Sequence, residues 1–372
     1  MNKLVFGNVL HRPLRTLISV VAVAIEVVMI LSIVAIMVGM LNNSRNQTGG
    51  IGGDIIVRAP NASFISAVGG APVPAKIADV LAKLPHVAVA APAISDFNMA
   101  AGGVETIWGI DFTSYNALRP FEFLAGGPFQ APNDVIVDDL YARAAPKGAP
   151  ARNVGATITL LNHPFRICGI VEHGKGGRVF LPIRTLGALL GSPDNASVFY
   201  IKSDSLANQA LIQKEIHDTP GLGNYQVQTI QEWMSLMTPE HLPGFNIALD
   251  TVITIAVIVG FLVIFQSLYT AVMERTREIG ILKSMGASKV YILNVILREA
   301  LLVSITGIIL GIVLTQLIKF GIQWHFPKFS FQLTNQWRIY ATLIALGGSL
   351  LGAIYPAWKA ARKDPIDALA YE

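Results

Sequence analysis

The sequence is poor in charge and almost free of cysteine. Only 14% of its 372 residues are Asp, Glu, Lys or Arg, whereas 52% are hydrophobic. Because soluble domains carry roughly a quarter charged residues, this composition excludes an ordinary soluble protein and indicates that much of the chain faces lipid. The single cysteine, Cys168, excludes an intramolecular disulfide framework, and the stretch FRICGIVE around it predicts a buried strand.

The sequence also lacks the common motifs of catalytic and metal sites. It contains no Walker A pattern, HExxH, CxxC or G-x-S-x-G, and its seven histidines are scattered without metal-ligand spacing. The paired carboxylates Asp138 and Asp139 are expected on an exposed surface. No block of Lys and Arg with interleaved aromatic residues argues for nucleic acid. We therefore expect no catalytic residue, metal ion, bound cofactor or nucleic-acid partner, and no ATP hydrolysis by this chain on its own.

What the sequence does contain is four long apolar runs. They cover residues 17–41, 249–272, 295–318 and 339–358. An α-helix rises about 1.5 Å per residue, so runs of this length can cross about 30 Å of hydrocarbon. The first run follows basic residues but lacks the short core and cleavage pattern of a signal peptide, so it predicts an uncleaved anchor. The four runs predict four transmembrane helices.

The basic residues predict how these helices are oriented. Lys and Arg concentrate before the first run, between the second and third, and after the fourth. By the positive-inside rule, both termini lie in the cytoplasm of a multi-pass protein of the inner membrane. The long segment between the first two runs then lies outside, and its alternating strand-like and helix-like stretches predict an α+β domain.

The predicted order is a cytoplasmic segment at 1–16, a first membrane helix at 17–41, an extracytoplasmic domain at 42–245, a second membrane helix at 249–272, a cytoplasmic helix and turn at 273–294, a third membrane helix at 295–318, a short external loop at 319–338, a fourth membrane helix at 339–358 and a cytoplasmic tail at 359–372.

Two stretches of the external segment carry local signals. GATITLLNHPFRICGIVE predicts a β-hairpin with its turn at Asn162 and His163. EHGKGGR places Lys175 and Arg178 among glycines, which raises the question of a phosphate-binding loop. It lacks the G-x-x-x-x-G-K-[ST] spacing and the helix that would direct amides at a phosphate, so a flexible hairpin tip is the better interpretation.

Small and polar residues within the apolar runs predict how the helices pack. Gly307 and Gly311 in the third run, and Gly348 and Gly352 in the fourth, have the spacing that lets helix backbones approach closely, although such spacing also arises by chance. Glu26 lies near the middle of the first run, where a carboxylate is costly unless it is protonated or hydrogen-bonded. It is either a packing residue or a proton-linked or substrate-linked site.

The stretch ERTREIGILKSMGAS, residues 274–288, is densely charged and lies between two apolar runs. At about 100° per residue its apolar side chains gather on one side of a helix, with charges of both signs around them. These apolar residues are Ile279, Ile281, Leu282 and Met285. Such a surface suits docking in a protein groove better than lying on lipid, although an ordinary solvated loop is the alternative. Gly286 is expected to stop the helix and Ser288 to cap the next one.

Residues 274–314, which begin with ERTREIGILKSMGAS, resemble the core motif of the FtsX-like permease family, the membrane subunits of ABC systems of the MacB and lipoprotein-release type. The C-terminal YPAWKAARKDPIDALAYE is similar to the closing pattern of that family. HRPLRTLISVVAVAIEVV resembles its opening Arg-Thr element, from which Glu26 departs. FEFLAGGPF, NDVIVDDLYA and VFLPIRTLGALLG resemble the MacB-type periplasmic core.

This resemblance implies a permease that pairs with an identical chain or a paralogue and binds two copies of a cytoplasmic ABC ATPase through the short helix after the second span. The implied coupling surface consists of Glu274, Arg275, Arg277, Glu278, Ile279, Leu282, Lys283 and Gly286. ATP and Mg would be held by the ATPase, which is expected on a separate chain. The ATPase would move the external domain and export a hydrophobic, lipid-like or peptide substrate, with a periplasmic adaptor as a further candidate partner.

The sequence leaves two alternative functions. Division-type members of the family use the ATPase cycle to activate a cell-wall hydrolase without transport, but the long MacB-like external segment favours export. A proton-coupled secondary transporter built around Glu26 is disfavoured because the sequence has only four spans and one deep acid.

Overall fold

The computed structural model describes residues 13–60, 62, 72–100, 103–144, 151–238, 244–325 and 329–363. The chain divides into two compact units. The helical unit comprises Met1–Gly39, Pro243–His325 and Ser330–Glu372, and the sheet unit comprises Met40–Leu242 and Phe326–Phe329.

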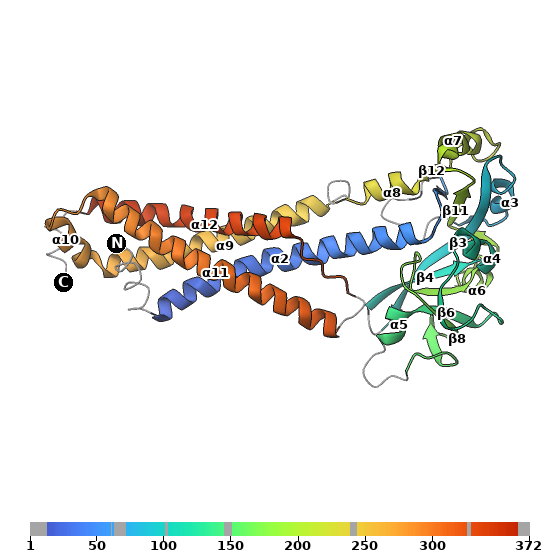
Figure 1. Cartoon of the computed structure of the whole chain (residues 1–372), viewed down its shortest axis with the longest axis horizontal. Helices are drawn as coiled ribbons and strands as arrows, with labels where there is room; N and C mark the ends of the chain where they lie inside the picture. The colour runs from blue at the N-terminus through green and yellow to red at the C-terminus, as the bar shows by residue number, and fades with distance from the viewer. Residues whose placement is uncertain are drawn as a thin grey trace. The chain divides into compact units, whose positions relative to one another are not determined.

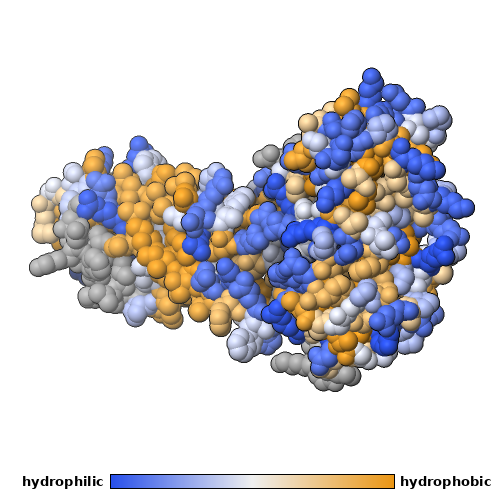
Figure 2. Space-filling model, turned by 45° about the vertical axis from the view of Figure 1, so that its right-hand side comes forward, coloured by the Kyte–Doolittle hydropathy of each residue, from blue (hydrophilic) through white to orange (hydrophobic). Residues whose placement is uncertain are grey.

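The helical unit is built from long apolar helices. They are α2 (Pro13–Gly50), α9 (Phe245–Glu274), α11 (Lys289–His325) and α12 (Asn335–Arg362), with the short α10 (Thr276–Ser284) between α9 and α11 (Figure 1). All four long helices have the length and composition to cross a membrane, as the apolar runs predict. On the face drawn in Figure 2, hydrophobic residues form a broad band over these helices, as lipid contact requires.

The helices are longer than the apolar runs that predicted them. α2 continues through the polar residues 42–50, and its last turns belong to the sheet unit. α11 continues to His325, so the predicted loop 319–338 is wrong at its start, and α12 begins at Asn335 rather than 339. Hydropathy detects only the part of a helix that faces lipid, whereas backbone hydrogen bonding continues into polar sequence.

Glycines allow the membrane helices to approach closely. A Cβ atom on Gly307 would lie 2.7 Å from the Cβ of Val23 in α2, and one on Gly311 would lie 2.8 Å from the Cβ of Val27. Gly352 of α12 fits against α9, where a Cβ would lie 2.8 Å from a backbone oxygen. These three predicted packing glycines therefore have no room for a side chain.

The sheet unit contains one continuous mixed sheet, with the strand order β12-β1-β11-β3-β4-β9-β6-β8-β5 and β7 paired with β8. Its strands are β1 (Ile55–Arg58), β3 (Val87–Ala100), β4 (Gly103–Ile110), β5 (Phe123–Gly126), β6 (Asp134–Asp138), β7 (Thr157–Leu160), β8 (His163–Val171), β9 (Val179–Pro182), β11 (Val198–Ser203) and β12 (Gln226–Thr229), and β2 (Val73–Pro74) pairs separately with β10 (Asn195–Ala196). Its helices are α3 (Ile77–Leu81), α4 (Phe112–Leu118), α5 (Asp139–Arg143), α6 (Ile183–Leu189), α7 (Gln209–Asp218) and α8 (Ile230–Leu236), with a 3₁₀ turn at Leu206–Asn208.

Successive residues along these strands alternate between two buried faces. In β1, Ile55 and Val57 join a hydrophobic cluster with α3 and α7, while Ile56 joins the cluster on the opposite face. Phe180 of β9 lies in the same cluster as Ile56, together with residues of α4, α8 and the last part of α2. Both faces of the sheet are thus covered by helices, which confirms the predicted α+β domain.

The predicted hairpin between β7 and β8 is present, but its turn lies one residue earlier than predicted. Leu160 pairs with His163, so the turn residues are Leu161 and Asn162. Both have positive φ, at 48° and 63°, as a two-residue type I′ turn requires. Asn tolerates this conformation, whereas the Leu gave no local signal for it.

Candidate functional site

The charged stretch between the second and third membrane helices forms α10, which begins directly after α9. Thr276, its first residue, is buried, and its hydroxyl donates to the carbonyl oxygens of Val272 at 3.2 Å and Met273 at 2.9 Å. These carbonyls belong to the last turn of α9, where intrahelical partners run out. α10 is therefore hydrogen-bonded directly to the end of α9.

α10 ends in a Schellman motif. Gly286 has a φ of 96°, its amide donates to the carbonyl of Lys283, and the amide of Ala287 donates to the carbonyl of Leu282, each at 3.0 Å. Ser288 then caps α11, because its hydroxyl accepts the amide of the third residue of that helix at 3.2 Å. The predicted stop at Gly286 and cap at Ser288 are both present.

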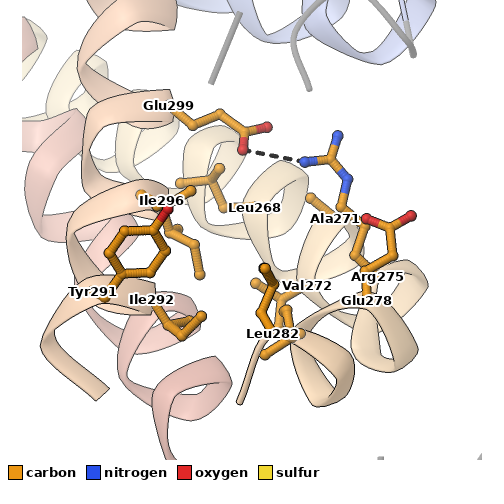
Figure 3. A pocket seen from close by; sticks show the side chains of 12 residues that line it. Leu268, Ala271, Val272, Arg275, Glu278, Leu282, Tyr291, Ile292, Ile296 and Glu299 are labelled. Atoms are coloured by element: carbon orange, nitrogen blue, oxygen red, sulfur yellow. Dashed lines mark hydrogen bonds and ion pairs between the residues drawn. The ribbon is translucent and has the colours of Figure 1, made fainter. Parts of the chain in front are cut away.

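An ion pair joins the start of α10 to α11. The guanidinium of Arg275 lies 3.3 Å from the carboxylate of Glu299, and only 11% and 9% of the two side chains are exposed (Figure 3). Because a buried charge requires a partner, this pair holds the α9–α10 junction against α11. Arg275 was predicted on the coupling surface, but it is directed inward and serves this contact instead.

Beside the ion pair lies a partly open hollow of about 60 Å³. Its walls come from α9, α10 and α11 (Figure 3). The lining residues are Leu268, Ala271, Val272, Arg275, Glu278, Ile279, Leu282, Tyr291, Ile292, Val295, Ile296 and Glu299. The apolar side of α10 therefore covers a space that its own side chains do not fill.

The apolar residues of α10 do not share one face, contrary to the prediction. Ile279 is buried in the core of the helical unit, and Leu282 packs against that core and lines the hollow. Ile281 and Met285 are instead exposed, by 43% and 71% of their surface. Ile279 therefore cannot contribute to a surface that contacts another chain, and the exposed pair replaces it.

The predicted charged residues divide in the same way. Glu274, Arg277 and Glu278 are exposed. Lys283 reaches the C-terminal end of α12, where its ammonium donates to the carbonyl oxygen of Ala361 at 3.1 Å and to that of the second residue beyond. We name the outward-facing residues of this helix and its stop the α10 surface: Arg277, Glu278, Ile281, Met285 and Gly286.

Glu26 of α2 is only 2% exposed, and its carboxyl group lies against α9 and α12. A Cβ atom on Gly260 of α9 would collide with its carboxyl group, and one on Gly348 of α12 would lie 3.9 Å from it. Neither carboxyl oxygen has a hydrogen-bond partner within the described part of the chain. Gly348, a predicted packing residue, leaves room for an ordinary contact, whereas Gly260, which was not predicted, is the glycine that this side chain requires.

The loop at 172–178 is not a flexible hairpin tip. β6 lies between β8 and β9 in the sheet, and Lys175 within the loop is only 6% exposed. Its ammonium donates to the carbonyl of Arg119 at 2.7 Å and to that of Pro120, and it lies 4.6 Å from the ring centroid of Phe121. Burial lowers the pKa of Lys175 to about 8. Because this cation is engaged with backbone carbonyls, it is not placed to hold a phosphate.

Asp138 and Asp139 are buried, not exposed as predicted. Asp138 caps α5 by accepting the amide of Tyr141 at 2.6 Å and pairs with Arg178 at 3.3 Å, while burial raises its pKa to about 6. Asp139 accepts from His173 at 2.9 Å, and although burial opposes it, this partner helps to hold the pKa of Asp139 below its usual value. Within the part of the chain that the structure describes, no group of three His, Cys, Asp or Glu side chains could hold a metal ion.

Two family models match most of the chain. The MacB-like periplasmic core domain matches residues 16–219, and the FtsX-like permease C-terminal domain matches residues 251–365. The chain belongs to the MacB-type FtsX-like permease family. The two matches follow the order predicted from the sequence, and the second includes α10, with its Schellman stop, and the helices on either side of it.

Relatives of this permease family member include longer proteins. This chain is 28% identical over 396 residues to the macrolide export ATP-binding/permease protein MacB of Shewanella sp. (strain W3-18-1). The match covers 97% of this chain and 59% of that protein. The chain is 29% identical over 318 residues to the protein of the same name from Escherichia coli (strain K12), covering 78% and 48% respectively. The chain thus spans about half the length of the curated relatives it matches.

Two solved structures are also similar. The periplasmic region of MacB from Actinobacillus actinomycetemcomitans gives a TM-score of 0.38 at 14% identity, covering 49% of this chain and 92% of that structure. The extracellular domain of the noncanonic ABC-type transporter YknZ from Gram-positive bacteria gives a TM-score of 0.35 at 14% identity, covering 47% and 98%. Likenesses of this size add no detail to the fold.

Proposed function

We propose that this chain is the permease subunit of an ABC exporter in the inner membrane. An ATPase on a separate chain, present in two copies, would hold ATP and Mg and dock on the α10 surface. Two permease chains, identical or paralogous, would form the membrane part. The sheet unit would lie outside the cell membrane and both termini inside, as the distribution of basic residues favours.

The observation that carries this proposal is the two-sided construction of α10. Its inner side, with Thr276 and Ile279, is built into the membrane helices, whereas Ile281 and Met285 are exposed between charges of both signs. Membrane-surface helices carry a mainly basic polar face, and this one does not. An apolar pair with a mixed charged rim is the pattern of a helix that docks in a protein groove.

The contacts of α10 also suit it to pass on movement. Arg275 ties its start to α11 through Glu299, and Lys283 ties its end to the terminal carbonyls of α12. A displacement of α10 by a bound ATPase would therefore act on two membrane helices besides α9. This supports mechanical coupling, in which the sheet unit exports or extracts a hydrophobic, lipid-like or peptide substrate.

The test uses the full-length chain, tagged and purified from the membranes of its native host in lipid nanodiscs. Ile281→Asp and Met285→Asp are compared with Leu206→Asp, which alters an apolar residue of the sheet unit whose exposure lies between theirs. We expect an ABC ATPase, identified by mass spectrometry, to co-purify with the wild type and the control, and its recovery to fall at least tenfold for the α10 variants.

Absence of an ABC ATPase from the wild-type preparation, or equal recovery with the α10 variants, would overturn the proposal. Capture of the ATPase together with a cell-wall hydrolase, without ATP-dependent export, would replace export by signalling while retaining the docking site.

A further inference from the structure

The end of α2 is packed against two loops of the sheet unit. Gly50, its last residue, lies so close to the carbonyl of Gly174 that a Cβ atom would collide with it. The amide of Gly176 donates to the carbonyl of Gln47 in the last turn of α2 at 2.9 Å. Ile51, directly after the helix, is 1% exposed and lies against Gly176. The loop at 174–177 thus grips the final turn of this helix.

The second loop supports the same turn from another direction. Gly52 has a φ of 85°, and a Cβ atom there would lie 2.5 Å from the Cβ of Arg119 and 3.0 Å from the carbonyl oxygen of Leu118. The chain that follows the last turn of α2 therefore passes between the segments 118–121 and 174–177. Neither Gly50 nor Gly52 has room for a side chain.

Lys175 fastens these two loops to each other. Its ammonium donates to the carbonyls of Arg119 and Pro120, while its own carbonyl accepts from the hydroxyl of Tyr115 at 3.1 Å. Tyr115 is fully enclosed in the aromatic core of the sheet unit and lies on α4. An ammonium can serve two carbonyls and a ring face at once because it has three donors and a full charge.

We propose that Lys175 holds the loop 174–177 to the segment 118–121, and that this contact transmits movement of α2 to the sheet unit. α2 is one continuous helix that begins among the membrane helices and ends packed between these two loops. Displacement of the helix becomes displacement of the sheet only if these loops stay bound to its last turn. This inference rests on the proposed function, and it makes Lys175 a positioning residue that acts far along the chain from α10.

Lys202 supplies a matched control for Lys175. Its ammonium donates to the carbonyl of Leu118 at 2.7 Å, so it contacts the same segment through a bond that does not involve the loop 174–177. Replacing either lysine with Met removes one ammonium and its hydrogen bonding from the same region. If Lys175 only supported the segment 118–121, both variants would lose the ATP-dependent change, whereas a role in linking the two loops would separate them.

The experiment measures hydrogen exchange of the full-length chain in lipid nanodiscs, with its ATPase bound, in the absence of nucleotide and in the presence of ATP and vanadate. In Lys175→Met we expect the amide of Gly176 to exchange at least tenfold faster, because its bond to α2 is no longer held closed. We expect ATPase recovery to be unchanged and the ATP-dependent change in exchange across the sheet unit to fall at least threefold. Lys202→Met should keep both exchange readouts within about twofold of the wild type.

The inference is overturned if Lys175→Met retains the ATP-dependent change, or if Lys202→Met loses it equally. Either result would leave the proposed function standing, because the ATPase would still be captured and active. If the wild type captures no ATPase, the proposed function fails and the transmission role of Lys175 fails with it, which is a distinguishable outcome.

Discussion

Arg275 and Glu299 form a buried ion pair at 3.3 Å, across the junction between α10 and α11. The two residues are 24 positions apart in sequence. The pair lies beside the hollow under α10 and is one of the polar contacts that hold this helix, together with those of Thr276 and Lys283.

We expect Arg275→Ala and Glu299→Ala each to destabilise the chain by about 3–5 kcal/mol, because each leaves one charge buried without this partner. The double variant should cost less than the sum of the two, since it removes both charges. Thermal unfolding of the purified full chain measures all three. Additive effects of the two substitutions would contradict a direct interaction between these residues.

Gly286 allows a test of the helix stop that leaves the contacts of α10 unchanged. Within this chain a Cβ atom there would meet nothing within 4 Å, so the effect of a substitution on the helix stop comes from the positive φ of 96°. We expect Gly286→Ala to weaken the stop by about 1 kcal/mol, and Gly286→Asn to be better tolerated because Asn enters this conformation more readily. Both are measured as recovery of the co-purified ATPase. If the two variants recover equal amounts of the ATPase, each well below the wild type, the cause is a contact made by the ATPase at position 286 and not the backbone conformation there.

Glu26 and Gly260 should behave as a complementary pair. Gly260→Ala places a methyl group where the carboxyl of Glu26 lies, so we expect it to destabilise the helix bundle by on the order of 1–3 kcal/mol. Glu26→Ala in the same chain should restore much of that loss by vacating the space. Gly347→Ala is the control, because a Cβ atom there meets nothing within 4 Å. Failure of the second substitution to rescue the first, in thermal unfolding of the full chain, would show that the two groups do not share this space.

Glu26→Gln separates packing from proton linkage, because it retains the volume of the side chain and removes its titration. ATP-dependent export that continues in this variant and stops without ATP would leave Glu26 as a packing residue. Export that stops in Glu26→Gln while the bundle unfolds at the wild-type temperature would instead assign the carboxyl a role in the transport step.

Lys175 predicts a pH dependence of stability in the alkaline range. Burial lowers the pKa of its ammonium from 10.5 to about 8. Between these values the unfolded chain holds the proton and the folded chain does not, so the contribution of this group to the free energy of unfolding increases with pH. Thermal unfolding of the full chain at pH 7.5 and at pH 10 should therefore show a rise that Lys175→Met lacks and Lys202→Met keeps. A rise of the same size in Lys175→Met would contradict the lowered pKa.

The features that depend on residues close together in the sequence could be predicted from it. Four membrane helices follow from hydropathy, and the stop at Gly286 and cap at Ser288 follow from the local preferences of Gly and Ser. The spacing of Gly307 and Gly311 likewise predicted a close contact with another helix, and that helix is α2.

Contacts between distant residues could not be predicted in this way. Lys283 meets Ala361, 78 positions away, so a residue with the sequence pattern of a docking surface is used inside the unit. Ile279 and Ile281 are two residues apart and equally apolar, and the packing of α10 against the neighbouring helices decides which is buried. Lys175 lies in a glycine-rich stretch typical of a mobile loop, but the carbonyls it binds belong to residues 119 and 120.

In the proposed function, ATP hydrolysis on one side of the membrane moves the sheet unit on the other. Hydrogen exchange of the wild-type complex in nanodiscs, without nucleotide and with ATP and vanadate, measures this directly. The account predicts a nucleotide-dependent change in exchange in the last turns of α2 and the loop 174–177, which disappears in Ile281→Asp. A sheet unit whose exchange is the same in both nucleotide states, while the bound ATPase hydrolyses ATP, would contradict it.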